Sequence, residues 1–115
     1  MTRNNDRKQG LAASLALALG LCAGTAWPDR AAASQALAQK HACIACHQPA
    51  AKVVGPSWKE IGARYGDGKT SAAQLAASIK AGSSGKWGAM PMPPQGRVPD
   101  ADLQSLAQWL IDGAP

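Results

Sequence analysis

The chain has 115 residues, among them three cysteines, four tryptophans, one tyrosine and no phenylalanine. This length fits a single domain, and three cysteines are too few for a framework of several disulfides, which disfavours both a large enzyme and a disulfide-rich toxin. The formal net charge is +5, but the positive residues lie singly, without a basic run or interleaved aromatic residues, which argues against nucleic-acid binding.

Residues 1–26 have the three-part order of a secretory signal peptide. A basic start is followed by an uncharged, mostly apolar stretch at 11–24, and small residues end the segment at Ala26. The apolar stretch is shorter than the roughly 20 residues that span a bilayer. We therefore predict that residues 1–26 are removed on export, which leaves a domain of residues 27–115 in the periplasm without stable membrane insertion.

This segment leaves alternatives open, an uncleaved membrane anchor among them. The small residues at 31–33 offer a second cleavage site after Ala33. Leu19-Gly20-Leu21-Cys22 is similar to a lipoprotein cleavage box, although Leu21 stands where a small residue is expected. The simpler interpretation places Cys22 in the apolar part of the signal, so that it is discarded.

The remaining domain is small enough to need a staple, such as a disulfide, a metal or a cofactor.

Four helical segments are predicted after the signal, at about residues 30–45, 57–65, 71–81 and 99–111. In the first segment, Leu37, His41 and Ile44 fall on one face of a helix. In the third segment, Ser71 can cap an apolar stripe that begins at Ala72. No segment shows the alternating pattern of a strand, so the sequence predicts a small all-α domain.

The segment 82–99 is rich in Gly, Ser and Pro and is predicted to be an irregular loop. Loops of this length in compact domains are usually either functional or disordered. This loop carries Trp87, Met90 and Met92 among its prolines. We therefore expect it to be ordered around an apolar group.

Residues 43–47, Cys-Ile-Ala-Cys-His, match the C-x-x-C-H attachment motif of c-type haem. Cysteines three residues apart lie on the same side of a helical turn, so each sulfur can form a thioether with one of the two haem vinyl groups. His47 is then placed to bind the iron. Three other uses fit less well. A redox dithiol lacks its βαβ context, a zinc site lacks a second pair of ligands, and a simple disulfide leaves His47 unexplained.

A second axial ligand would decide the chemistry of such a haem. Met/His ligation raises the reduction potential and closes the iron to other ligands, whereas an open position suits gas binding or peroxide chemistry. The candidates are Met90 and Met92, which spacing does not separate, although the prolines around Met92 restrict its backbone. His41 is a remote third candidate, because it precedes His47 by six residues on the same segment.

Six short segments follow one another in a known order: Cys43–His47, Val54–Pro56, Ile79–Ser83, Lys86–Gly88, Pro91–Pro94 and Leu106–Trp109. With them the chain resembles, from about residue 33 to 109, the small bacterial class I cytochromes c, and most of all the cytochrome c-551 type. The resemblance implies a class I cytochrome c fold, with about four short helices wrapped around one covalently attached haem c. It also implies that the first and last helices cross near Leu37, Leu106 and Leu110.

The resemblance assigns the haem-binding residues. It implies that Cys43 and Cys46 form the thioethers, and that His47 and Met92 are the axial iron ligands. Met92 matches the methionine of the family because it lies between prolines, whereas Met90 stands where the family tends to have an aliphatic residue.

Supporting roles are implied in the same way. The carbonyl of Pro56 would accept a hydrogen bond from the His47 ring, and the indole N–H of Trp87 would bind a haem propionate. Trp58 would lie near the haem edge, with an ordinary core position as the alternative. Gln95 departs from the family, which often has an asparagine at this position.

The function that this resemblance implies is single-electron transfer by a monomeric periplasmic protein that is not an enzyme. Redox donors and acceptors would dock transiently at the haem edge, guided by lysines such as Lys40, Lys52 and Lys86. Two alternatives stay open at this point: a haem peroxidase or gas-binding sensor, and a subunit fixed in a larger oxidoreductase.

Overall fold

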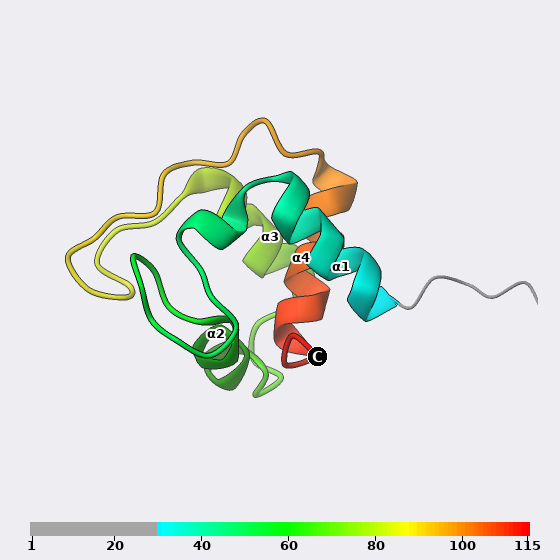
Figure 1. The fold of residues 1–115 in the computed structure, drawn as a ribbon, viewed down its shortest axis with the longest axis horizontal. Coiled ribbons are helices and arrows are strands. Elements are labelled where there is room, and N and C mark those ends of the chain that lie inside the picture. The colour runs from blue at the N-terminus through cyan, green and yellow to red at the C-terminus, as the bar shows by residue number, and fades with distance from the viewer. Residues whose placement is uncertain (1–29) are drawn as a thin grey trace, which may run out of the picture.

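The computed structural model describes residues 30–115, so the predicted signal peptide, its cleavage site after Ala26 and Cys22 lie outside the described residues. The helices are α1 (Arg30–Lys40), the short 3-10 helix η1 (Cys43–Ala45), α2 (Trp58–Tyr65), α3 (Ala72–Ala81) and α4 (Asp100–Ile111) (Figure 1). The described range contains two isolated β-bridges and no strand, which confirms the predicted all-α class. None of its helices is both long and apolar enough to cross a bilayer.

The first predicted helix, residues 30–45, is wrong after Lys40. The α-helix ends at Lys40, and the chain then turns through Ala42, whose φ of 57° is left-handed. A left-handed residue cannot continue an α-helix, so the residues after it form the separate 3-10 turn η1. Ile44 consequently leaves the predicted apolar face, and 43% of it is exposed.

Helix α4 is the centre of the fold, and α1, α2 and α3 each pack against it (Figure 1). Its buried side chains are Leu103, Leu106, Ala107, Trp109 and Leu110. On α1 the buried residues are Ser34 and Ala38, with Leu37 partly buried against the same core. The Ser34 hydroxyl donates to the carbonyl of Ser105 at 3.4 Å. The predicted packing of the first helix on the last is therefore present.

Helices α2 and α3 both begin with a capping box, in which two side chains satisfy backbone N–H groups that would otherwise lack partners. At α2, the Ser57 N–H donates to the Glu60 carboxylate at 2.7 Å, and the Glu60 N–H donates to the Ser57 hydroxyl at 3.1 Å. These bonds favour the charged carboxylate and lower the pKa of Glu60. Ser71 and Gln74 form the corresponding pair at α3. The box at Ser57 sets where α2 begins, directly after Pro56.

A polar contact joins the end of α1 to the first turn of α4. His41 Nε2 lies 2.8 Å from the Asp102 carboxylate, and the Lys40 ammonium lies 3.4 Å from it. The hydrogen bond from His41 is the largest cause of a lowered pKa at Asp102, and Lys40 adds to it. This nitrogen of His41 is thus engaged by a carboxylate of α4.

Replacing Asp102 should make stability depend on pH in a defined way. Since the folded state lowers the pKa of Asp102 from its usual 3.8, its stabilisation is present at neutral pH and is lost as pH falls through the lowered pKa. Asp102→Asn should therefore unfold at a lower temperature than the unaltered protein at neutral pH, and the gap should close in acid as the pH falls below the usual pKa of 3.8. In a His41→Ala background the same substitution should cost less. A gap that is equal at both pH values would contradict this role.

Candidate functional site

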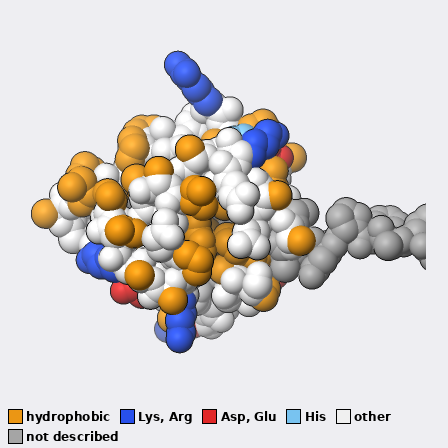
Figure 2. Space-filling model, viewed as in Figure 1, with side chains coloured by type: hydrophobic (Ala, Val, Ile, Leu, Met, Phe, Trp, Pro, Cys, Tyr) orange, Lys and Arg blue, Asp and Glu red, His pale blue; other side chains and the backbone are white. Residues whose placement is uncertain are grey.

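A cavity of about 170 Å³ opens between α2, α3, α4 and the loops at 47–57 and 82–99. Its lining is mainly apolar and includes Ile61, Leu75, Ile79, Leu106 and Leu110. Hydrophobic side chains gather around a hollow in the middle of the face shown in Figure 2, with lysine and arginine side chains toward its edges. The helices thus place their apolar faces around a space that side chains of the described residues do not fill.

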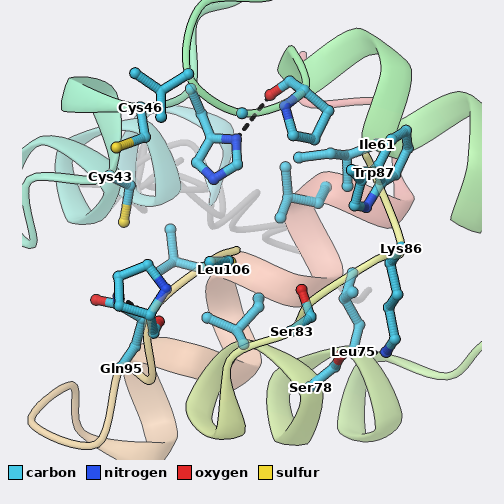
Figure 3. A pocket seen from close by; sticks show the side chains of 18 of the residues that line it. Cys43, Cys46, Ile61, Leu75, Ser78, Ser83, Lys86, Trp87, Gln95 and Leu106 are labelled. Atoms are coloured by element: carbon cyan, nitrogen blue, oxygen red, sulfur yellow. Dashed lines mark hydrogen bonds between the residues drawn. The ribbon is translucent and has the colours of Figure 1, made fainter. Parts of the chain in front are cut away.

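Cys43 and Cys46 line one side of this cavity, where they lie next to each other (Figure 3). The 3-10 turn explains this, because side chains three residues apart eclipse one another in such a helix. Neither cysteine forms a disulfide with a described residue. Burial raises the pKa of the unattached Cys43 thiol, a backbone hydrogen bond opposes this rise, and the charge of Cys46 adds to it. The two sulfurs are therefore presented together to one group in the cavity.

His47 is buried at the same side, with 8% of its surface exposed. Its Nδ1 lies 2.7 Å from the carbonyl oxygen of Pro56. A carbonyl can only accept, so Nδ1 carries the proton and the Nε2 lone pair is left as a donor to a metal. The ring also stacks on Trp58, with centroids 5.0 Å apart and planes at 27°. Trp58 thereby belongs both to the core, at 7% exposure, and to the cavity wall.

Gly55 is a residue whose role the sequence did not indicate. A Cβ at this position would lie 2.7 Å from Cε1 of the His47 ring, closer than atoms can approach. Its N–H donates to the Cys46 carbonyl at 2.8 Å, which holds the loop against the imidazole. The motif Val54-Gly55-Pro56 therefore combines a glycine that makes room for the ring with a proline carbonyl that orients it.

The two methionines differ in how they are held. Both line the cavity, but 63% of Met90 is exposed. The backbone of Met92 forms a β-bridge with Ser83, through N–H donations of 2.8 Å and 3.0 Å. Gln95 secures the turn that follows, because its side-chain amide donates to the Pro93 carbonyl at 2.9 Å. The loop thus fixes the position of Met92 and leaves Met90 at the surface.

Gly82 allows this arrangement, and Gly85 provides a matched control. Both have a positive φ, of 74° and 73°. A Cβ on Gly82 would lie 2.6 Å from the Met92 carbonyl oxygen, whereas a Cβ on Gly85 would meet nothing within 4 Å. The left-handed backbone is therefore common to both sites, and the close approach of the methionine loop is particular to Gly82.

We expect Gly85→Ala to cost about 1–2 kcal/mol of unfolding free energy, from backbone strain alone. Gly82→Ala should cost at least about 1 kcal/mol more, because the 92–94 segment must also move. Denaturant unfolding of the two variants measures the difference. Equal losses would show that the contact between Gly82 and the methionine loop contributes nothing.

Trp87 lies at the other side of the cavity (Figure 3). It packs edge-on against Tyr65, with centroids 6.1 Å apart. The Arg64 guanidinium lies 4.4 Å from the Trp87 ring centroid and donates to the Lys86 carbonyl at 2.6 Å. These contacts have no signal in the sequence, and they fix the orientation of Trp87 from α2. Of the three lysines expected to guide partners, Lys40 is paired with Asp102.

These donors do not form a site for a bare metal ion, since residues 30–115 contain no group of three or more His, Cys, Asp or Glu side chains that could hold one. They do fit a flat apolar cofactor with a metal at its centre. Two thiols stand at one side, an imidazole with a free Nε2 lies beside them, and a thioether side chain comes from the opposite loop. The βαβ unit of a thioredoxin-like dithiol is likewise absent from the described range.

Comparison with known proteins agrees with this fit. A family model described as "Cytochrome C oxidase, cbb3-type, subunit III" matches residues 29–110. Cytochrome c-552 of Nitrosomonas europaea is 55% identical over 75 residues, which are 65% of this chain and 73% of that protein. Cytochrome c-551 of Allochromatium vinosum is 41% identical over 81 residues, covering 70% of this chain and 86% of the relative.

Among solved structures, the crystal structure of N. europaea cytochrome c552 matches with a TM-score of 0.65 and 52% identity, covering 69% of this chain and 98% of that one. The chain therefore belongs to the class I cytochromes c, which confirms the resemblance inferred from its motifs. It is an electron-carrying haem protein. Its c-type haem is covalently bound, and Cys43 and Cys46 fit the attachment motif.

Proposed function

We propose that the mature protein is a periplasmic single-electron carrier whose haem iron is bound by His47 and Met92. The bound haem supplies a one-electron couple between ferric and ferrous iron. The observation that carries the proposal is that two donors are held by backbone contacts. Pro56 orients the His47 imidazole, and Ser83 holds the backbone of Met92 from the loop across the cavity.

The hydrogen bond between His47 and Pro56 has two consequences in this proposal. It fixes the tautomer that leaves Nε2 as the donor, and it makes the imidazole a stronger ligand. Trp58, stacked on the ring, restricts its rotation and keeps water from it. His47 therefore keeps one position as the charge of its partner changes, which suits repeated electron transfer.

A peroxidase or gas sensor is the principal rival, and it requires an open or easily displaced ligand position. The support for a closed position is the bridge between Ser83 and Met92, reinforced by the prolines on either side of the methionine. The proposal is therefore that the protein transfers electrons and does not catalyse a reaction on a small substrate.

The ligand can be tested with two matched variants. Met92→Ala should abolish the weak long-wavelength absorption of thioether-to-ferric-iron ligation, because the alternative thioether at Met90 is exposed and lacks the backbone bridge. Met90→Ala should retain this absorption. The optical spectrum of each purified holoprotein measures the effect. The reverse pattern would assign the ligand to Met90, and rapid binding of carbon monoxide by the unaltered ferrous protein would favour the rival function.

Redox partners would dock transiently around the exposed side of the cavity. Four large apolar side chains of the described residues are exposed there or on the adjoining loops: Ile44, Val53, Val54 and Met90. A small apolar patch of this kind with lysines around it suits weak encounters, which bury little surface. A fixed place as a subunit is the alternative, since the matching family model is described as an oxidase subunit. A monomeric elution volume for the native protein would favour the free carrier.

Export is part of the same proposal, with residues 1–26 as the signal peptide and 27–115 as the cytochrome domain. When the full chain is expressed in a bacterium, the haem-containing protein of the periplasmic fraction should begin at Trp27. Mass spectrometry of the intact protein measures this. A start at Ser34 would move the cut to after Ala33, and a lipid-modified protein that begins at Cys22 and stays with the membrane would contradict the soluble carrier.

A further inference from the structure

Lys86 has a side chain that follows the wall of the cavity. It is one of the residues that line the cavity, next to Trp87. Its ammonium donates to the hydroxyl of Ser78 on α3 at 2.9 Å. Figure 3 shows the side chain running beside Leu75 to Ser78. A lysine that only attracts partners would extend into water, whereas this one is held along the cavity by a neutral hydroxyl.

The acidic side chains of the described residues are all engaged away from the Trp87 side of the cavity. Each acidic side chain in residues 30–115 has a hydrogen-bond or ion-pair partner of its own: Glu60 with Ser57, Asp67 with Lys69, Asp100 with Lys80, Asp102 with His41 and Lys40, and Asp112 with Gln108. Within this range, neither Lys86 nor Arg64 forms an ion pair with a carboxylate. Lys86 thus lies at the cavity and Arg64 lies over the Trp87 ring, and no carboxylate of the described residues pairs with either cation.

The cofactor can supply that counter-charge at this place. The two vinyl groups of haem and its two propionates lie at opposite edges of the macrocycle. Attachment through Cys43 and Cys46 turns the vinyl edge toward η1. Trp87 and Lys86 lie across the cavity from the two cysteines (Figure 3). The edge that faces Lys86 would therefore be the one with the carboxylates.

We propose that Lys86 is a haem-binding residue, whose ammonium, held by Ser78, pairs with a haem propionate beside Trp87. Arg64 contributes indirectly, because it covers the Trp87 ring and binds the Lys86 carbonyl, which holds this segment in place. The inference rests on the covalent attachment at Cys43 and Cys46 in the proposed function. It replaces the expectation that Lys86 guides redox partners.

Two measurable properties follow from the pair. A cation beside a carboxylate favours its charged form, so Lys86 lowers the pKa of the propionate. A positive charge near the iron also favours the ferrous form, which has one positive charge fewer, so Lys86 raises the reduction potential. Because the lysine is exposed, solvent weakens both effects.

The test compares Lys86→Met and Lys86→Gln with Lys86→Arg. Lys59→Met is the matched control, because it removes the same charge from an exposed lysine of α2 outside the cavity lining. We expect both neutral variants to shift the ferrous/ferric equilibrium toward ferric by about threefold, where tenfold corresponds to 59 mV for one electron. The fall of potential with rising pH that reports the propionate pKa should move to higher pH. Lys86→Arg and Lys59→Met should resemble the unaltered protein.

Potentials measured by optical redox titration across about pH 5 to 9 give both readouts, and neither depends on a redox partner. Unchanged potentials and pH profiles in both neutral variants, or equal changes in Lys59→Met, would overturn the proposal. The optical spectrum of the unaltered protein separates this outcome from failure of the proposed function. If that spectrum lacked the absorption of thioether-to-iron ligation, the carrier proposal itself would be contradicted.

Discussion

The hydrogen bond between the His47 ring and the Pro56 carbonyl is the contact on which the site depends. It requires a backbone loop that passes against an imidazole, and only a glycine at position 55 leaves the space, since a Cβ would lie 2.7 Å from the ring. It also requires the Pro56 carbonyl to lie in the loop before α2. The capping box of Ser57 and Glu60 ensures this, because it starts the helix directly after Pro56. A helix terminus, a glycine and a carbonyl together determine the orientation of one nitrogen.

The other half of the site is built from backbone as well. The segment 82–99 has no helix or strand, yet the bridge between Ser83 and Met92 folds it back on itself beside the end of α3. Gly82, which has no side chain, allows residues 92–94 of this loop to approach the end of α3 closely. The loop is therefore ordered by a few hydrogen bonds and by its prolines. Its length allows it to carry the Met92 thioether to the wall of the cavity across from His47.

The small size of the domain also has a physical explanation in this arrangement. Helix α4 contributes most of the buried apolar residues, but Leu106 and Leu110 also face the cavity. A chain without phenylalanine that surrounds a cavity gains the missing apolar contact from its covalent haem. The cofactor therefore completes the core in addition to carrying the electron. In the arrangement proposed above, Trp87 and Lys86 would neutralise its carboxylates at the far edge.

The sequence by itself determined the class of fold and the cofactor, and it predicted the residues that hold the haem. The spacing of Cys43, Cys46 and His47 admits one economical use, and apolar periodicity located α3 and α4. These features depend on neighbours in the chain, so they can be read from it.

Only the tertiary structure decided two kinds of feature. One is a contact between residues that are distant in sequence, and the other is a backbone angle that the residue type does not favour. The left-handed Ala42, which ends α1 early, has no compositional signal, since alanine favours a helix. The clearance at Gly55, the cation over Trp87 and the bond from Lys86 to Ser78 depend on where α2, α3 and the loop meet. Local preference cannot specify such meetings, because packing around α4 and the shared cavity sets them.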